Sequence, residues 1–521
     1  MNKKLIILTT ITFLGFILRI YRLDVRPLGF TWDEAALGYN AFSLLQTGRD
    51  EHARRLPIIF KSFGDYKPGL YIYSTVPAIN IFGLNEFATR LPSAIFGTLL
   101  IIVVYLLTRN IFASLLLAIN PWAMHFSRGA WEANLNLLLV TLAVLLFIKK
   151  NYLTSALFFG LTLWAYQGAK FFTPVILISL ILIYKPNFQK LFKPLLLLLL
   201  LLLPIAIGFG SQSGRLKVFS VFSYVRPDSA VSEILRQDGS SVKNLTYYLF
   251  HSEIFDQGRG VVQRYLNHFS PRFLFVDGDW SNPRHSTPFY GYLHIPEILT
   301  LLIGLYFFFK LQTSNFKLIL LWLLLAPLPA ALSRDLVSGV RSIPMIIPLV
   351  IISGLGLSKI LSKKLLILLY SPALLLFTIY FLDLYFVHSP FYFSQYWLTP
   401  YKHTIELINN NIAGFDRVVF TNTLGQPYIF VLFYNRIDPG FFWTRSQRVD
   451  NPVGDVGEVT NLDKYAFMRV DWPTQRGDTS TIFVGNQYEL PDQDMNPPNL
   501  VRLGEIEYPD GLPGLRIVGL K

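Results

Sequence analysis

Residues 194–210 read PLLLLLLLLLPIAIGFG, in which nine leucines in a row, Leu195 to Leu203, stand between two prolines. The stretch carries no charge, and its length falls within the range of helices that cross a bilayer. It is the most extreme of many apolar runs, because 52% of the 521 residues are hydrophobic and only 15% are charged. The composition therefore predicts a polytopic membrane protein.

The net charge of +13 could suggest binding to nucleic acid, but the basic residues gather in short connections between apolar runs. These connections contain no acidic residue, so the positive-inside rule assigns them to the cytoplasm. The basic residues in them are Lys3, Lys4, Arg109, Lys149, Lys150, Lys185, Lys190, Lys193, Lys310, Lys317, Lys359, Lys363 and Lys364. The basicity therefore orients the chain in the membrane.

With this orientation the apolar runs predict eleven transmembrane helices, an N-terminus inside and a C-terminus outside. The predicted spans are 4–22, 89–108, 111–127, 133–148, 152–168, 170–185, 194–210, 295–310, 317–333, 341–357 and 364–383. The segment from Pro68 to Gly83 is short and contains Pro77, and counting it as a span would put the later lysines outside. We predict that it is an interfacial helix on the outer surface, with Tyr71 and Tyr73 at headgroup level.

The predicted membrane domain, residues 1–383, has two large outer loops, 24–88 and 211–294. Beyond residue 383 the chain becomes polar, and short β-branched runs such as Thr481 to Val484 alternate with helical stretches. This pattern predicts a small extracytoplasmic α/β domain over residues 384–521. The chain has no cysteine, which excludes disulfides, thiol nucleophiles and thiolate metal sites.

Two acids, Asp33 and Glu34, follow the first span on its outer side. A carboxylate is the usual base in glycosyl chemistry, so both are candidate catalytic residues, and Asp33 is the better one because it comes first where the chain leaves the membrane. An alternative is that the two acids cap a following helix from Glu34 to Leu45. Both interpretations can hold together.

Candidate cations for an anionic, lipid-borne substrate occur in both outer loops. A leaving phosphate needs fixed positive charge, which Lys67 and the pair Arg284-His285 could supply. The alternatives are that Lys67 extends to lipid headgroups and that His285 is an ordinary loop histidine.

A third acid, Glu132, lies at the predicted outer mouth between two spans and could orient the acceptor or tune the pKa of Asp33. Its alternative role is that of a helix-start acid paired with Arg128. The residues expected to support the site are Asp65, Tyr66, Tyr71, Arg90, Arg128 and Arg341.

The order of these motifs resembles the GT-C superfamily of integral-membrane glycosyltransferases, in particular the protein O-mannosyltransferase and lipid A aminoarabinose transferase group. The resemblance rests on the early Asp-Glu pair and on four further blocks, Asp65 to Tyr71, Ala88 to Ser93, Ser127 to Asn134 and His268 to Ser286. It is clearest over residues 15–135 and 265–345.

The resemblance implies inverting transfer of a sugar from a polyprenyl-phosphate donor to an acceptor on the outer face, without an obligatory metal or other cofactor. By the same resemblance, Asp33 is the catalytic acid of the first outer loop, Lys67 the lysine of the donor phosphate and Glu132 the acid of the second loop. The chain departs from the pattern at Gly69, where relatives often have proline, and at Glu132, where they often have aspartate. The longer Glu132 side chain could therefore serve the acceptor.

The predicted function is that of a plasma-membrane glycosyltransferase whose partners are the lipid-linked donor and a lipid, glycan or protein acceptor. One alternative is a lipid-linked oligosaccharide transferase or ligase with a diphosphate donor. A glycolipid transporter is the other alternative, but it would need a polar path through the bilayer, which the uncharged spans do not offer.

Overall fold

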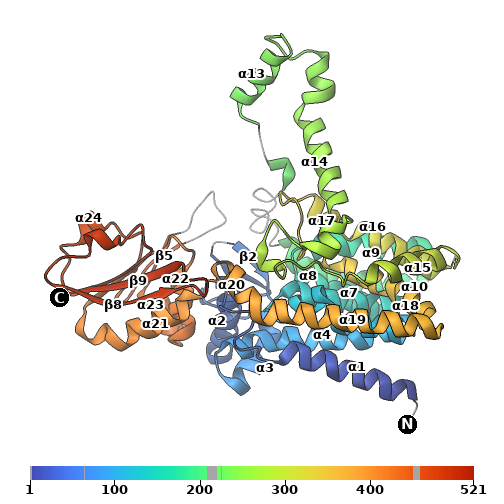
Figure 1. Ribbon diagram of the computed structural model, residues 1–521, viewed down its shortest axis with the longest axis horizontal. Helices are drawn as coiled ribbons and strands as arrows, with labels where there is room; N and C mark the ends of the chain where they lie inside the picture. The colour runs from blue at the N-terminus through green and yellow to red at the C-terminus, as the bar shows by residue number, and fades with distance from the viewer. Residues whose placement is uncertain (1–2, 64, 208–219, 224–225, 312, 450–457) are drawn as a thin grey trace.

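A bundle of long helices forms one end of the molecule and a β-sheet domain the other (Figure 1). The computed structural model describes residues 3–63, 65–207, 220–223, 226–311, 313–449 and 458–521. The chain begins at the far end of the bundle and finishes at the far edge of the sheet.

The bundle contains the predicted membrane spans. Each span corresponds to one helix or to two short helices in line, namely α1 (Lys3–Ile20), α4 (Glu86–Thr108), α5 (Ile111–Ile119), α6 (Pro121–Phe126), α7 (Glu132–Ile148), α8 (Tyr152–Ala165), α9 (Ala169–Tyr184), α10 (Phe188–Ile207), α15 (Glu297–Phe309), α16 (Ser314–Leu325), α17 (Leu328–Ala331), α18 (Ile346–Ile360) and α19 (Lys364–Asp383). Five described helical segments are long and apolar enough to cross a membrane by length and composition alone. The predicted class, a polytopic α-helical membrane protein with a small C-terminal α/β region, is confirmed.

Two details of the spans differ from the prediction. The third span breaks at Asn120, whose side chain accepts a hydrogen bond from the Ala123 amide and so caps α6, while Pro121 occupies the first helical position. The helix of the leucine run starts at Phe188 rather than at Pro194, so both Pro194 and Pro204 lie inside the helix.

Small residues allow two bundle helices to touch along their backbones. A Cβ atom added at Gly304 of α15 would lie 2.0 Å from the carbonyl oxygen of Ile352 on α18, and one at Gly356 would lie 1.9 Å from that of Thr300. Any side chain at these positions would force α15 and α18 apart, as expected where membrane helices pack through glycine.

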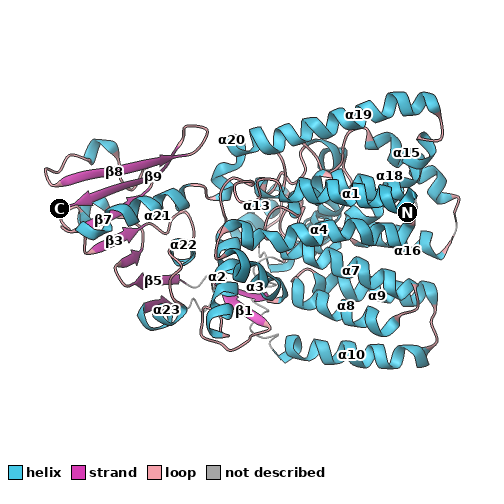
Figure 2. Cartoon of the chain, turned by 90° about the horizontal axis from the view of Figure 1, so that it is seen from below, coloured by secondary structure: helices cyan, strands magenta, loops and turns pink. Residues whose placement is uncertain are grey.

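Two shorter helices and a hairpin lie where the bundle meets the sheet domain (Figures 1 and 2). They are α2 (Trp32–Thr47), α3 (Leu70–Phe82), β1 (Ile59–Ser62) and β2 (Asp65–Pro68). The predicted headgroup position of Tyr71 is wrong, because its side chain is fully buried and its hydroxyl donates to the Thr89 carbonyl oxygen. Tyr73 is half-buried, and its hydroxyl donates to the Pro57 carbonyl oxygen.

Among the described residues, the C-terminal sheet has seven strands in the order β4-β5-β6-β3-β7-β9-β8, with β6, β3 and β7 parallel. The strands are β3 (Arg417–Phe420), β4 (Ser446–Val449), β5 (Glu458–Leu462), β6 (Tyr465–Phe467), β7 (Thr481–Gly485), β8 (Leu500–Glu507) and β9 (Pro513–Leu520). The helices after the bundle are α20 (Ser389–Phe393), α21 (Pro400–Asn411), α22 (Pro427–Tyr434), α23 (Pro439–Arg445) and α24 (Trp472–Gln475). The domain boundary at residue 383 stays a prediction.

One hydrophobic core joins this sheet to α2 and α3. Buried side chains of α2 and α3, such as Leu37 and Ile72, belong to the same cluster as Phe430 of α22 and Val484 of β7. The sheet domain is therefore packed firmly against the end of the bundle that carries α2 and α3, and against α2 in particular.

An arm is built from α13 (Asp228–Gln237) and α14 (Glu253–Asn267). It extends from the end of the bundle nearer the sheet domain, and it runs across the direction of the bundle helices (Figure 1). No residue of α14 is buried, and Ile254 is 83% exposed. Large apolar side chains alternate on the arm with charged ones such as Arg259. This composition is typical of a helix that lies in a membrane interface.

Candidate active site

Asp33 stands in the first turn of α2, and the start of that helix is fixed by a capping box. Thr31 accepts a hydrogen bond from the Glu34 amide, and the Glu34 carboxylate accepts one from the Thr31 amide. Such a cap stabilises a helix by about 1 kcal/mol and sets the direction of its first turn. The Asp33 side chain takes no part in this capping box and is 37% exposed.

Two cations from distant segments flank the Asp33 carboxylate. The ammonium of Lys67 on β2 forms an ion pair with Oδ1 of Asp33. The guanidinium of Arg284, in a short turn at Pro283–His285, lies 3.9 Å from Oδ2. The structure therefore brings together the first-loop acid, the first-loop lysine and the arginine of the second large loop.

Several neighbours hold Arg284 in place. The Asn282 side chain accepts from the Arg284 amide at 3.2 Å, and Nε2 of His125 lies 2.9 Å from the Arg284 carbonyl oxygen. The guanidinium lies over the ring of Trp131, at 5.7 Å from its centroid. Within the described residues its buried Nε has no hydrogen-bond partner. Arg284 therefore keeps donor capacity for a ligand.

The His285 side chain contacts a different carboxylate, that of Asp279. Its Nδ1 lies 2.8 Å from the buried carboxylate of Asp279, which also accepts the Gly339 amide. Burial lowers the pKa of His285 below its usual value, although Asp279 opposes this shift. The imidazole is therefore neutral at pH 7 and stabilises the loop rather than adding charge beside Asp33.

Glu34 has a structural partner. Its carboxylate accepts two hydrogen bonds from the guanidinium of Arg90, at 2.8 and 3.1 Å, and a third from the Ala130 amide. Both side chains are buried, and Arg90 also donates to the carbonyl oxygen of Gly29. This pair connects α2, α4 and the loop before α7, so the helix-capping interpretation describes Glu34 best.

Glu132 is the first residue of α7 and is half-buried. Burial, together with the charges of Glu34 and Glu132, raises the pKa of Tyr71 well above its usual value. Arg128 is the partner that the sequence suggested for Glu132. Its guanidinium donates to the carbonyl oxygens of Leu18, Tyr21 and Arg26, and so connects the end of α1 to the α6–α7 corner.

For the remaining predicted residues, the structure gives other contacts or none that can be described. The Asp65 side chain lies outside the described residues, although its backbone belongs to β2. The carbonyl oxygen of Tyr66 accepts a hydrogen bond from Gln167. Arg341 pairs with Asp335 and donates to Ser333, so it fixes its own loop.

The sheet domain reaches the site through the loop after β3. This loop contains Gly425, whose added Cβ would lie 2.4 Å from the ring of Trp32, the residue before Asp33. The carboxyl ends of the parallel strands β3 and β7 point toward the bundle (Figure 2). In open α/β sheets this edge is where ligands bind.

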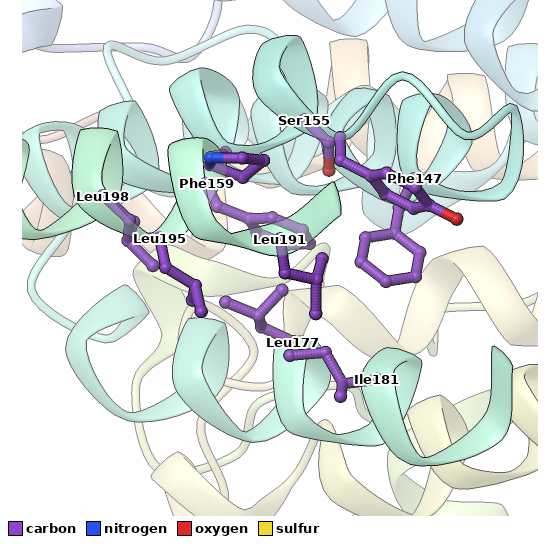
Figure 3. A pocket seen from close by; sticks show the side chains of 11 residues that line it. Phe147, Ser155, Phe159, Leu177, Ile181, Leu191, Leu195 and Leu198 are labelled. Atoms are coloured by element: carbon purple, nitrogen blue, oxygen red, sulfur yellow. The ribbon is translucent and has the colours of Figure 1, made fainter. Parts of the chain in front are cut away.

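A narrow apolar pocket lies among α7, α8, α9 and α10 (Figure 3). Its wall includes Phe147, Leu177 and Leu195. Phe147 is at the end of α7 opposite to Glu132, roughly 20 Å away along the helix. This pocket is a crevice between membrane helices and is separate from Asp33.

The sequence interpretation missed several residues of the site. Trp131 stacks near Arg284, and the hairpin residues Phe60 and Ser62 line a pocket with Asp33. The alternation of Phe60 and Ser62 just before Lys67 is a strand signal that could have found them. No local signal connects Asp279 with His285, because their contact depends on the loop conformation.

The fold and the site define a multi-pass membrane protein with a carboxylate flanked by two cations at one end of its helical bundle. Residues 9–124, which contain Asp33, Lys67 and Arg90, match the family model described as dolichyl-phosphate-mannose-protein mannosyltransferase. No curated protein sequence matches the chain. The resemblance to the GT-C superfamily, inferred from the sequence motifs, is thereby confirmed.

Among solved structures, the chain is similar to the crystal structure of ArnT from Cupriavidus metallidurans bound to undecaprenyl phosphate. The TM-score is 0.57 at 11% sequence identity, over 99% of this chain and 97% of that one. ArnT in the apo state gives a TM-score of 0.54 at 11% identity over the same shares of the two chains. The archaeal oligosaccharyltransferase AglB from Archaeoglobus fulgidus, with a dolichol phosphate and an inhibitory peptide, gives 0.46 at 14% identity, over 79% of this chain and 58% of that one.

Proposed function

We propose that this protein is an inverting glycosyltransferase that moves a sugar from a polyprenyl-phosphate donor to an acceptor at the outer face of the membrane. The observation that carries the proposal is the Asp33 carboxylate, flanked by Lys67 and Arg284 at one end of an apolar helical bundle. The match to the mannosyltransferase family model over residues 9–124 supports it. The fold shared with ArnT over nearly the whole chain agrees with it.

The three side chains divide the reaction between them. Lys67 and Arg284 bind the donor phosphate and stabilise the negative charge that grows on it as its bond to the anomeric carbon breaks. Asp33 accepts the proton of the acceptor as that group attacks the anomeric carbon. The phosphate leaves as a stable anion, so the leaving group needs no general acid.

The same two cations supply the charge that a metal ion supplies in other phosphate sites. With Asp33 they give a local balance of two positive charges and one negative charge. This excess favours an anionic donor. We therefore propose that transfer needs no obligatory divalent cation.

The first test removes the phosphate contacts one at a time. Lys67→Gln and Arg284→Gln are each expected to raise the KM for the donor roughly 10- to 100-fold, because a charge-assisted hydrogen bond contributes about 1.5–3 kcal/mol. The measurement is a donor saturation curve in which release of the polyprenyl phosphate is followed.

Arg272→Gln is the matched control, because this arginine lies in the same outer loop but is exposed and paired with Asp277. It should leave the donor KM unchanged. An unchanged KM in the Lys67 and Arg284 variants as well would rule out the assigned phosphate site.

The proposed location is the plasma membrane, with the N-terminus in the cytoplasm and the sheet domain outside. The support is the set of basic residues in the short connections between spans, such as Lys149 and Lys150, which lie at the end of the bundle away from Asp33. The exposed apolar side chains of the α13–α14 arm agree with an interface at the end that holds Asp33.

The chain has no cysteine, so single engineered cysteines report topology without background. We expect a membrane-impermeant maleimide to label Ser241→Cys on the arm and Thr479→Cys in the sheet domain of intact cells. Ser362→Cys, between α18 and α19, should react only after the membrane is opened. All three positions are exposed. The reverse labelling pattern would overturn the proposed orientation.

A further inference from the structure

Asp279 is a buried acid that the proposed reaction does not use. It is 1% exposed and precedes Arg284 by five residues in the same outer loop. A carboxylate is stable in a buried position where hydrogen bonds and charges satisfy it, so its contacts show what it does. The contacts of Asp279 lead to the turn that presents Arg284 to Asp33.

Among the described residues, four donors converge on the two carboxylate oxygens of Asp279. Oδ1 accepts from the Ser281 amide at 3.1 Å and from the Asn282 amide at 2.9 Å. Oδ2 accepts from the Gly339 amide at 2.8 Å and lies 2.8 Å from Nδ1 of His285, which carries a proton where it faces a carboxylate. An ionised carboxylate can accept from all four, whereas an amide side chain would turn its own NH2 group toward two of the donors. The position therefore needs an acid.

Asn282 connects this acid to Arg284. Its backbone amide donates to Asp279, and its side-chain oxygen accepts from the Arg284 amide at 3.2 Å. The side chain thereby caps the short turn Pro283–His285, as asparagine caps the start of a helix. Because the backbone dihedrals decide which rotamers a side chain can adopt, these two contacts limit where the Arg284 guanidinium can lie.

The Gly339 contact gives the turn a rigid base. The Gly339 carbonyl oxygen accepts from Nε1 of Trp122 at 3.0 Å, and the Trp122 ring stacks on that of Tyr292 with 4.1 Å between the centroids. The Tyr292 hydroxyl donates to the His285 carbonyl oxygen at 3.1 Å. A Cβ atom at Gly339 would lie 1.8 Å from the Tyr292 hydroxyl, so the loop can approach this ring only with glycine there. Asp279 is thus joined to buried aromatic side chains of the bundle.

Within the part of the chain that the structure describes, the contacts of the Arg284 guanidinium itself are loose. Its distance to Oδ2 of Asp33 is 3.9 Å, the Trp131 ring centroid is 5.7 Å from Cζ, and Nε has no hydrogen-bond partner. An arginine that binds a phosphate through two parallel hydrogen bonds needs its planar group in one orientation. The backbone of the turn must therefore supply order that the side-chain contacts lack.

We propose that Asp279 and Asn282 are positioning residues, which together hold the turn Pro283–His285 so that Arg284 meets the phosphate of the lipid-linked donor. The assignment rests on the proposed function, in which Arg284 binds that phosphate. Neither positioning residue contacts the donor in this assignment. Each acts through Arg284, because a binding group misplaced by about 1 Å can lose up to roughly 100-fold in effectiveness.

The test measures the Kd of the purified protein in detergent for polyprenyl phosphate, the donor without its sugar, so that binding is followed apart from transfer. Asp279→Asn should raise this Kd roughly 3- to 10-fold, because two donors of the loop lose their acceptor and the turn shifts. Asp277→Asn is the matched control, because it makes the same change in the same loop at a side chain that is 34% exposed and paired with Arg272. It should leave the Kd unchanged.

A double variant separates positioning from a general loss of structure. If Asp279 acts through Arg284, the variant Asp279→Asn with Arg284→Gln should bind polyprenyl phosphate as weakly as Arg284→Gln alone. A merely structural role would lower the fraction of folded protein and leave the Kd of the folded fraction unchanged. Losses that multiply in the double variant, or an unchanged Kd in Asp279→Asn, would overturn the role of Asp279.

Asn282 provides a second variant, which decides the proposal if Asp279→Asn does not fold. Its side chain is half-buried, so the protein should tolerate the change. Asn282→Ala removes the acceptor of the Arg284 amide and should raise the Kd roughly 3- to 10-fold. Asn282→Ser restores a capping oxygen and should recover most of the affinity, since serine caps about as well as asparagine. Equal affinities of Asn282→Ala and wild type would show that the cap does not place Arg284.

The same measurements distinguish failure of this inference from failure of the proposed function. If Arg284→Gln binds polyprenyl phosphate as tightly as wild type, the proposed phosphate site is wrong and the positioning role falls with it. If Arg284→Gln weakens binding but neither Asp279→Asn nor Asn282→Ala does, the phosphate site stands and the positioning role alone is wrong.

Discussion

Asp33→Asn is expected to abolish sugar transfer while leaving the protein folded in the membrane. The amide cannot accept the acceptor proton, and loss of a general base typically costs about 10²–10⁴-fold in rate. The fold should survive, because Asp33 makes no part of the capping box and its ion pair with Lys67 is partly exposed. The measurement is turnover at saturating donor and acceptor, with the melting temperature in detergent as the check on folding.

The control for this variant is Asp24→Asn, which makes the same chemical change at an exposed position between α1 and α2. It should transfer sugar at the wild-type rate. Asp33→Glu keeps the carboxylate but moves it by one methylene, so partial activity is expected from it. Near-normal turnover by Asp33→Asn would refute the assignment of the base and require another proton acceptor.

Arg90→Met should produce the largest loss of stability of any single change near the site. The substitution leaves the buried Glu34 carboxylate without its cation and frees the carbonyl oxygen of Gly29. Removal of one partner of a buried ion pair costs about 3–5 kcal/mol. The expected result is a marked fall in the apparent melting temperature of the purified protein.

Arg259→Met is the matched control, because it breaks an arginine–aspartate pair that is exposed on α14. An exposed pair contributes only about 0–1 kcal/mol, so the melting temperature should hardly change. The double variant Glu34→Gln with Arg90→Met should recover part of the loss, since no charge then stays buried alone. Equal melting temperatures for Arg90→Met and wild type would show that the pair does not hold α2 to α4.

The predicted membrane helices were recovered closely, and the local errors have clear causes. Chain length and hydrophobicity cannot reveal that Asn120 caps a new helix within a span, because the break needs the Asn120 side chain to turn onto the Ala123 amide. Tyr71 was predicted at the headgroups from the general preference of tyrosine for interfaces. Its burial follows from packing of α3 against α2 and α4, which the sequence of α3 alone does not encode.

The candidate site was predicted in part. The sequence predicts Asp33 and Lys67 from their position after the first span, and it predicts Arg284 together with His285 from the second large loop. The sequence could not separate Arg284 from its neighbour, because the two differ in which way a short turn directs them. In the structure Arg284 faces Asp33, whereas His285 faces Asp279.

The sequence by itself determined the class of the protein. The length of an apolar run and the placement of lysines between runs are local properties, because the thickness of the bilayer sets the length of a span and the lysines set its orientation. The sequence favoured Asp33 over Glu34 as the base, but only the tertiary structure shows how differently the two side chains are placed. Successive residues of a helix point about 100° apart, so one acid turns to the open pocket and the other to the buried Arg90. The tertiary structure also brought Ser62 and Phe60 beside Asp33, because that contact joins a hairpin to a helix across a long separation in the chain.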